Sequence, residues 1–237
     1  MLIGVNSLLL FLLILIYFII LLLFHNKYKN YWWSNFFIIS SILILTTQIL
    51  NSSFDLILFL IGSISYLVLD TIAVYKKHWK YNTKSGYVLW AGPAWGFLTL
   101  VVFRLNETIS SELIILLALS VLFLLVTNIK KNLSPKNYFA SPWIPFAFIC
   151  LFLSPSLFLV SLAIGIIFEY IAVELLKTWT YPKPIYGLIG LGYGTLMVYL
   201  QLVLELIGGN KSVVNLFFVI ILTVFVLLHK LGLLKNK

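Results

Sequence analysis

The sequence predicts an all-α membrane protein, a polytopic bundle of about nine transmembrane helices. The first observation is composition. Of 237 residues, 62% are hydrophobic and 10% are charged, whereas a soluble globular domain has about 45–50% apolar and about 25% charged residues. The second is that apolar runs of membrane-spanning length recur along the chain, and the third is that lysines concentrate in alternate polar clusters between them. One membrane domain over residues 1–237 accounts for the whole pattern.

The spans follow from the length of each apolar run, because a helix needs roughly 20 residues to cross about 30 Å of hydrocarbon. They are predicted at residues 2–24, 32–50, 54–74, 85–103, 111–127, 137–153, 154–176, 186–207 and 213–229. The sixth is short and holds Pro142 and Pro145, and only Ser154-Pro155-Ser156 separates it from the seventh. A single bent or re-entrant pair therefore remains an alternative for these two spans.

The basic residues orient the bundle, because Lys and Arg are retained on the cytoplasmic side of a membrane. With the N-terminus outside, all of the 16 basic residues except Arg104 and Lys211 fall on the inner side. Removing or adding one span would destroy this asymmetry. We therefore expect nine spans, N-out and C-in, in a prokaryotic plasma (inner) membrane. The net charge of +9 is then a topology signal, and no nucleic-acid partner is expected.

Two stretches of the chain resemble each other at an offset of 98 to 99 residues. Residues 69–81 read L-D-T-I-A-V-Y-K-K-H-W-K-Y, and residues 168–181 read F-E-Y-I-A-V-E-L-L-K-T-W-T-Y, with one extra residue before the tryptophan. Further on, G-P-A-W-G (92–96) aligns with G-L-G-Y-G (190–194). We expect residues 31–130 and 131–237 to be two parallel four-helix repeats, with residues 1–30 as an extra first span.

Asp70 and Glu169 are the candidate catalytic residues, one in each predicted repeat. An ionisable side chain within a membrane span is costly and usually faces a bundle interior, a cavity or a partner. If the two carboxyls meet, they can serve as an acid/base pair with one protonated and one ionised. The alternative is that each makes a helix-to-helix hydrogen bond, for example to Tyr87 or Tyr193. Arg104 and Glu205, near the outer ends of their spans, are expected to pair across the repeat.

Aromatic residues gather at the level of the two acids and are the candidate substrate-binding residues. They are Trp79, Tyr81, Trp90, Trp95, Trp179, Tyr181 and Tyr193. Their faces can stabilise a cationic intermediate or solute, while the alternative is an aromatic belt that anchors helices at the headgroup level. The scattered histidines and the single Cys150 lack metal-ligand spacing. We expect neither a metal nor a cofactor.

The segment D-x-x-A-V-x-x-x-x-W-x-Y, from Asp70 to Tyr81, resembles the integral-membrane lycopene cyclase family of archaeal, actinobacterial and fungal type. The second copy, with Glu169, Trp179 and Tyr181, is similar to the related carotenoid hydratases. Where that family has a P-x-E-E-like acidic pair, this chain has Pro93-Ala94-Trp95-Gly96. The resemblance implies cofactor-free proton chemistry on a polyene or isoprenoid double bond.

Three functions are compatible with these features. The first is a membrane enzyme that performs cofactor-independent acid/base chemistry (cyclisation, hydration or isomerisation) on an isoprenoid- or carotenoid-like lipid in a cytoplasm-facing pocket. The second is a proton- or cation-coupled transporter of a small solute that uses the same acids. The third is a non-enzymatic membrane subunit. The expected partners are membrane lipid or a lipophilic substrate, and assembly into a homo-oligomer stays open.

Overall fold

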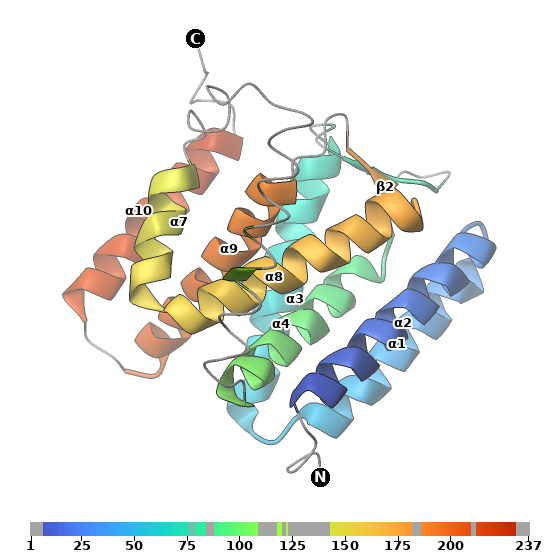
Figure 1. Ribbon diagram of the computed structural model, residues 1–237, viewed down its shortest axis with the longest axis horizontal. Coiled ribbons are helices and arrows are strands. Elements are labelled where there is room, and N and C mark those ends of the chain that lie inside the picture. The colour runs from blue at the N-terminus through green and yellow to red at the C-terminus, as the bar shows by residue number, and fades with distance from the viewer. Residues whose placement is uncertain are drawn as a thin grey trace.

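The computed structural model describes residues 7–75, 77, 79–83, 88–108, 118–119, 122, 143–181, 186–209 and 212–230. Within them the chain is mostly helical, with one small two-stranded sheet (Figure 1). The α-helices are α1 (Ser7–Tyr28), α2 (Trp32–Ile49), α3 (Ser53–Tyr75), α4 (Ala91–Thr108), α7 (Trp143–Leu153), α8 (Pro155–Tyr170), α9 (Tyr186–Ile207) and α10 (Val213–Lys230). A π-helix, η1 (Ile171–Leu175), and strands β1 (Lys80–Tyr81) and β2 (Trp179–Thr180) complete these elements.

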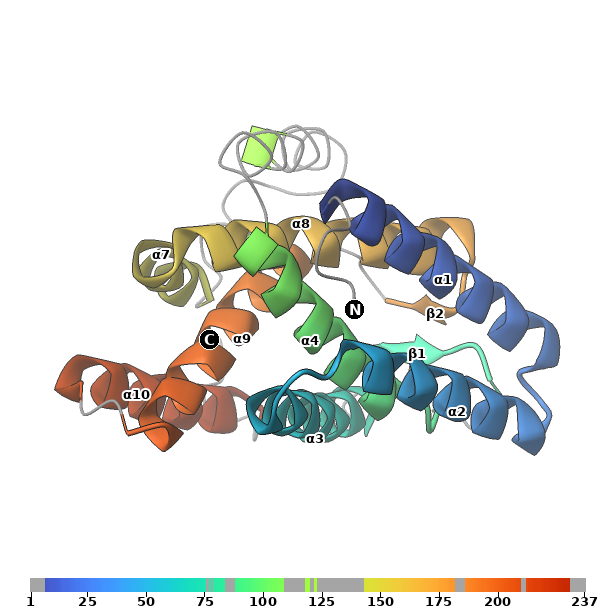
Figure 2. The ribbon, with the colours of Figure 1, turned by 90° about the horizontal axis from the view of Figure 1, so that it is seen from below.

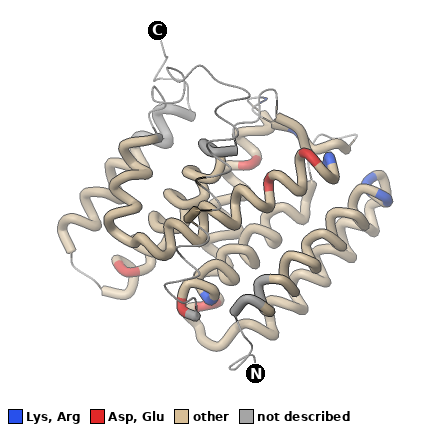
Figure 3. Tube along the Cα trace, viewed as in Figure 1, with Lys and Arg blue, Asp and Glu red and all other residues tan. Residues whose placement is uncertain are grey.

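Four helical segments are long and apolar enough to cross a bilayer, which indicates a membrane protein. They are Trp32–Ile49, Ser53–Tyr75, Pro155–Leu175 and Ile189–Ile207. The described parts of three further helices, Leu12–Tyr28, Ile144–Leu153 and Val213–Val224, are apolar but shorter. Large apolar side chains are exposed along α1, α2, α3 and α10, as expected for surfaces in contact with lipid. Charged residues gather toward the helix ends, and the helix middles are nearly free of them (Figure 3).

The helices form two halves that meet along α4 and α8. In one half α3 packs against α4, with α2 beside them, and in the other α8 packs against α9, with α7 and α10 beside them. Contacts of α4 with α8 and of α3 with α9 join the halves, and α1 packs on α2 and α4 (Figures 1 and 2). A continuous apolar core runs through both halves.

Glycines at matching positions allow the central helices of each half to approach closely. A Cβ on Gly96 of α4 would lie 2.5 Å from the carbonyl oxygen of Phe59 in α3. A Cβ on Gly194 of α9 would lie 2.8 Å from the ring of Phe158 in α8. These are the aligned glycines of the two G-x-x-x-G segments, and small residues are favoured where membrane helices pack closely.

α4 begins at Ala91, whereas the predicted span begins near residue 85. α7, described over Trp143–Leu153, meets α8 at Ser154, whose non-helical backbone (φ −148°, ψ 79°) precedes Pro155 at the first turn of α8. This break lies where the sequence places the boundary between the sixth and seventh spans. The predicted fifth span, residues 111–127, and the start of the sixth lie outside the described residues, apart from isolated positions in the fifth.

Candidate functional site

Two W-x-Y segments about a hundred residues apart lie side by side in the small sheet. β1 follows α3, β2 follows η1, and the strands pair antiparallel, with Tyr81 opposite Trp179 and Lys80 opposite Thr180. A further backbone bond of 3.0 Å, from Asn82 N–H to the Thr178 carbonyl, extends the pairing. The sheet places the ends of α3 and η1 next to each other.

Asp70 is held by its own W-x-Y segment, which folds back over the end of α3. The indole N–H of Trp79 donates to Asp70 Oδ1 at 2.9 Å. The hydroxyl of Tyr81 lies 3.2 Å from both Oδ1 and Oδ2. Only 2% of Asp70 is exposed, so these donors replace the water that an exposed carboxyl would bind.

Glu169 is held in the same manner, with one additional donor. The indole N–H of Trp179 and the hydroxyl of Tyr181 both donate to Oε2 at 2.9 Å. The hydroxyl of Tyr193, from α9, donates to Oε1 at 2.7 Å. Glu169 is 3% exposed. A carboxyl that accepts three hydrogen bonds and donates none is arranged as an ionised carboxylate would be.

The extra residue in the second motif is absorbed by the π-helix. Trp79 is the ninth residue after Asp70, and Trp179 is the tenth residue after Glu169. A π-turn contains one residue more than an α-turn, and the Leu176 N–H accordingly bonds the Ile171 carbonyl at 2.8 Å. In both motifs a lysine two residues before the tryptophan then turns the chain back: Lys77 has φ 59° and Lys177 has φ 52°, the left-handed conformation that often follows a helix end.

Aromatic rings connect the two acids across the sheet. The Trp79 ring lies 5.6 Å from the Tyr181 ring, and the Tyr81 ring lies 5.7 Å from the Trp179 ring. Each W-x-Y donor of one acid thus contacts a W-x-Y donor of the other. We call the two acids and their four W-x-Y donors the twin-acid site; it consists of Asp70, Trp79, Tyr81, Glu169, Trp179 and Tyr181.

The two halves of the site differ one helix turn away from the acids. Trp95 of α4 stacks on Tyr66 of α3, with ring centroids 4.0 Å apart. The matching residue of α9, Tyr193, lies against Gly165, where a Cβ would come within 2.5 Å of the tyrosine ring. Because Gly165 leaves this space, Tyr193 reaches Glu169 with its hydroxyl, whereas Trp95 turns its ring to Tyr66.

Two residues of this region were not singled out from the sequence. Tyr66 lies four residues before Asp70 and therefore on the same face of α3, a spacing that could have identified it. His25 of α1 accepts the indole N–H of Trp90 at Nδ1, at 3.1 Å, and is 1% exposed. No local pattern relates His25 to Trp90, because the pair joins the first helix to the segment before α4.

A small cavity lies beside the twin-acid site. Its lining includes four of the seven predicted substrate-binding aromatics: Tyr81, Trp90, Trp95 and Trp179. Trp79, Tyr181 and Tyr193 are not among the lining residues; they donate to the acids, as Tyr81 and Trp179 also do. The cavity measures about 10 Å³, the space of one water, so a larger ligand enters only if the rings move apart.

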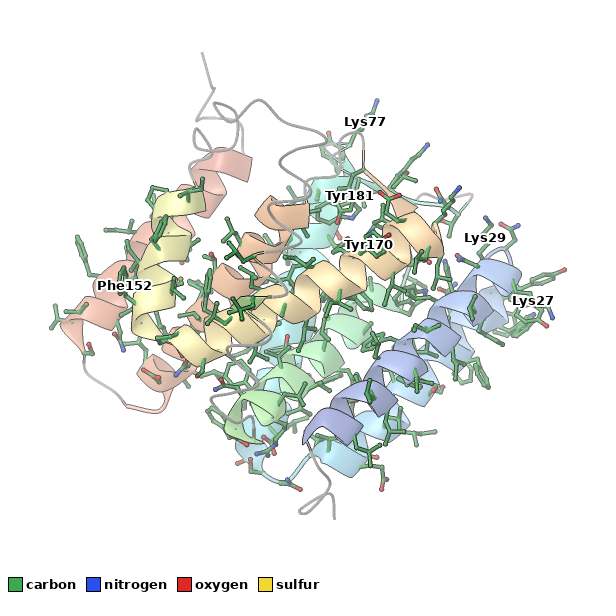
Figure 4. All side chains as sticks on the ribbon, in the orientation of Figure 1. Lys27, Lys29, Lys77, Phe152, Tyr170 and Tyr181 are labelled. Carbon is green, nitrogen blue, oxygen red and sulfur yellow. The ribbon has the colours of Figure 1, made fainter. Side chains whose placement is uncertain are left out.

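Basic residues surround the end of the bundle that carries the twin-acid site. Lys27 and Lys29 lie at the end of α1, and Lys77 lies near Tyr181 beside the sheet (Figure 4). The Asn26 side chain bonds the Leu176 carbonyl at 2.6 Å, which fixes the end of α1 beside η1. The pKa of the Tyr181 phenol is raised well above its ordinary value, mainly by burial and secondly by the negative charge of Glu169.

The opposite end of α4 carries a separate ion cluster. Arg104 pairs with the buried Asp55 of α3 at 2.5 Å and with Glu107 at 2.8 Å. Glu205 accepts hydrogen bonds from Gln201 and Asn215. The two ion pairs of Arg104 with Asp55 and Glu107 lie within its own half of the bundle.

Within the described part of the chain, no group of three His, Cys, Asp or Glu side chains is placed to hold a metal ion. Comparisons of the chain with protein-family models, with curated proteins and with solved structures gave no match.

Proposed function

We propose that this protein is an integral membrane enzyme that moves protons on and off a carbon–carbon double bond of an isoprenoid-type lipid. The observation that carries the proposal is the twin-acid site: two buried carboxyls, each held by a Trp and a Tyr of the same motif and joined by ring contacts. Burying two ionisable groups inside membrane helices is costly and is typical of functional sites.

The topology that accompanies this proposal is two parallel four-helix repeats in a nine-span, N-out and C-in chain. Matching glycines, matching acids and matching left-handed lysines in the two halves support the repeats. The lysines near the sheet support a cytoplasmic position for that end. The twin-acid site then opens toward the inner face, where protons are exchanged with water.

The hydrogen bonds divide the roles between the acids. Glu169 has both oxygens occupied by short bonds from three donors, which favours the ionised form and the role of general base. Among the described residues, the donor to Asp70 Oδ2 is the Tyr81 hydroxyl at 3.2 Å, which is shared with Oδ1. That oxygen has room for a proton, so Asp70 is assigned as the general acid.

The chemistry balances as a proton-neutral rearrangement. Asp70 gives its proton to one alkene carbon, and the pair of π electrons forms the new C–H bond, leaving a carbocation on the neighbouring carbon. Attack by a second double bond closes a ring and moves the cation, or the cation stays in place. Glu169 then removes a proton from a carbon beside the cation, and those C–H electrons form the new double bond. Proton exchange with water returns Asp70 to its acid form and Glu169 to its carboxylate.

The rings around the site suit the cationic intermediate. The aromatic rings near the acids include Tyr81 with Trp90 and the stacked pair of Trp95 and Tyr66. A ring face that contacts a cation stabilises it by about 0.5–2 kcal/mol, more when water is excluded. The small cavity has room for about one water, which limits trapping of the cation as an alcohol.

Turnover of candidate polyenes by the purified protein tests this function. The wild-type protein is incubated with acyclic isoprenoids, and products are separated by mass and retention time. We expect isomeric products from the wild type and none from Asp70→Asn or Glu169→Gln. Glu107→Gln, which removes an exposed carboxyl at the far end of α4, serves as the control. Unchanged turnover in both acid variants would exclude the proposal.

One observation favours a second function, a non-enzymatic membrane subunit. Three donors occupy both oxygens of Glu169, and the adjacent cavity measures about 10 Å³. This arrangement also suits acids that fasten the sheet to the helices. In that case a stoichiometric partner co-purifies with the chain, and Asp70→Asn lowers its stability without affecting any turnover.

A further inference from the structure

We propose that the space between α1, α4 and α8 is a binding passage for a linear hydrocarbon chain of a membrane lipid, leading to the twin-acid site. A second cavity of about 20 Å³ lies between these three helices. It shares three lining residues, Phe18, Leu98 and Phe168, with the cavity beside the twin-acid site. The two spaces are therefore neighbours separated by shared side chains. The binding of a hydrocarbon chain is independent of the proposed function, and only its reaction at the twin-acid site rests on that function.

The lining selects the chemistry of the occupant. Among the described residues, those that border the second cavity are aliphatic or phenylalanine, and they include Val101 and Leu105 of α4 and Ile164 of α8. A polar group placed there would lose its hydration without gaining a hydrogen bond from these side chains. Apolar cavities of this kind stay dry and take up apolar ligands. The occupant is therefore hydrocarbon over this stretch.

The length of the lined stretch favours an extended chain over a compact molecule. From Trp90 at the first cavity to Leu105 at the second is a path along α4 of about 22 Å at about 1.5 Å per residue. This exceeds half of the roughly 30 Å hydrocarbon core of a bilayer. A prenyl or acyl chain that enters from the bilayer can lie along this path, with its end beside the aromatic rings of the twin-acid site.

Phe18 of α1 closes the passage. Its side chain is buried, it borders both cavities, and its ring lies 5.0 Å from Phe168 and 5.9 Å from Phe97. Cavities of about 10 and 20 Å³ hold water-sized groups, so a chain occupies the passage only when the Phe18 ring is displaced. The end of α1 is meanwhile held by the bonds of His25 to Trp90 and of Asn26 to Leu176.

Energy transfer from the tryptophans to a conjugated tetraene fatty acid measures binding, with the full-length protein in lipid nanodiscs. Val101→Phe fills the second cavity and should weaken binding about tenfold, the effect of losing roughly two buried methylenes. Phe18→Ala removes the closing ring and should tighten binding about tenfold. The matched controls are Val68→Phe and Phe37→Ala, both at exposed positions, and both should bind as the wild type does.

A polyprenyl alcohol added as competitor distinguishes the two sources of hydrocarbon. Displacement of the tetraene at equal concentration assigns the passage to prenyl chains, and its failure assigns the passage to acyl chains. If Val101→Phe does not fold, Phe18→Ala alone decides: equal affinities of Phe18→Ala and Phe37→Ala overturn the proposal. Equal tetraene affinities of Val101→Phe and Val68→Phe, when both variants fold, would also overturn the proposal.

Asp70→Asn separates this inference from the proposed function. The passage predicts unchanged tetraene binding in Asp70→Asn, since Asp70 does not line the second cavity. Binding that follows the predicted pattern without turnover in any protein would refute the enzyme and leave the passage. Turnover in the wild type, with tetraene binding insensitive to Phe18 and Val101, would refute the passage and leave the enzyme.

Discussion

Removing one hydroxyl group from Tyr193 tests whether Glu169 is an ionised acceptor in the folded protein. The Tyr193 hydroxyl donates to Glu169 Oε1 at 2.7 Å in a buried setting. Tyr193→Phe keeps the ring contacts with Trp95 and Gly165 and leaves Oε1 without this donor. A hydrogen bond to a charged group is worth about 1.5–3 kcal/mol. We expect the free energy of unfolding to fall by about 2 kcal/mol.

Tyr199 in the same helix supplies the matched control. Its hydroxyl lies 2.8 Å from Thr223 Oγ1 of α10, so both partners are neutral. Hydrogen bonds between membrane helices average about 0.6 kcal/mol, and Tyr199→Phe should cost about that much. The predicted difference between the two variants is therefore about 1.4 kcal/mol, or a factor of about ten in the unfolding equilibrium constant.

Equilibrium unfolding in mixed micelles, followed by tryptophan fluorescence, measures both variants against the wild type. Glu169→Gln provides the second side of a double-mutant cycle with Tyr193→Phe. If the two tyrosine variants lose equal stability within about 0.5 kcal/mol, Glu169 does not act as an ionised acceptor, and the assignment of Glu169 as general base is wrong.

Two further predictions concern the same region. Because the pKa of Tyr181 is raised, above about pH 10 the unfolded chain loses the phenol proton while the folded chain keeps it, so the free energy of unfolding should fall as pH rises. Unfolding measured over this pH range should show a shallower fall for Tyr181→Phe than for the wild type. An identical slope would contradict the burial of the phenol. Gly165→Ala should lower stability by about 1–3 kcal/mol, because its Cβ would meet the Tyr193 ring at 2.5 Å. Gly192→Ala, where a Cβ meets nothing within 4 Å, should raise stability by about 0.5–1 kcal/mol in the same unfolding assay; equal effects at Gly165 and Gly192 would contradict the close packing of α8 and α9.

The sequence predicted the helical membrane class and placed both W-x-Y segments at the level of the acids. It did not predict that these segments bond the acids or that they pair with each other. Apolar run length is a local property, so α2 and α3 begin and end close to the predicted spans. β1 and β2 have two residues each, too few for any period, and their pairing joins segments a hundred residues apart. The return of Trp79 and Trp179 onto the acids depends on this pairing.

The extra residue before Trp179 was visible in the sequence, and its consequence was not. A one-residue insertion can lengthen a loop or produce a π-turn, and only the packing of η1 against the sheet decides between them. The seven aromatics show a comparable limit. Their shared depth is readable from the spans, whereas the stacking of Trp95 on Tyr66 and the bond of Trp90 to His25 depend on contacts between distant helices.

Arg104 illustrates why long-range ion pairs escape sequence reasoning. The repeat suggested Glu205 as a partner of Arg104. In the structure α3 packs antiparallel to α4, so Asp55 at the start of α3 lies 2.5 Å from the Arg104 guanidinium. Asp55 also accepts a hydrogen bond from the Asn51 backbone N–H at 2.7 Å, near the start of α3. From the sequence this local bond is sufficient to explain Asp55, so its pairing with Arg104 is not evident.

Deuterium incorporation during turnover in D₂O tests the central claim most directly. If Asp70 delivers a solvent-exchanged proton to the alkene and Glu169 removes a different one, each product molecule gains one deuterium, which mass spectrometry detects as an increase of one mass unit. The account predicts this increase in the wild type and no deuterated product from Asp70→Asn. Product that forms without deuterium, or deuterated product from Asp70→Asn at the wild-type rate, would contradict proton transfer by the twin-acid site.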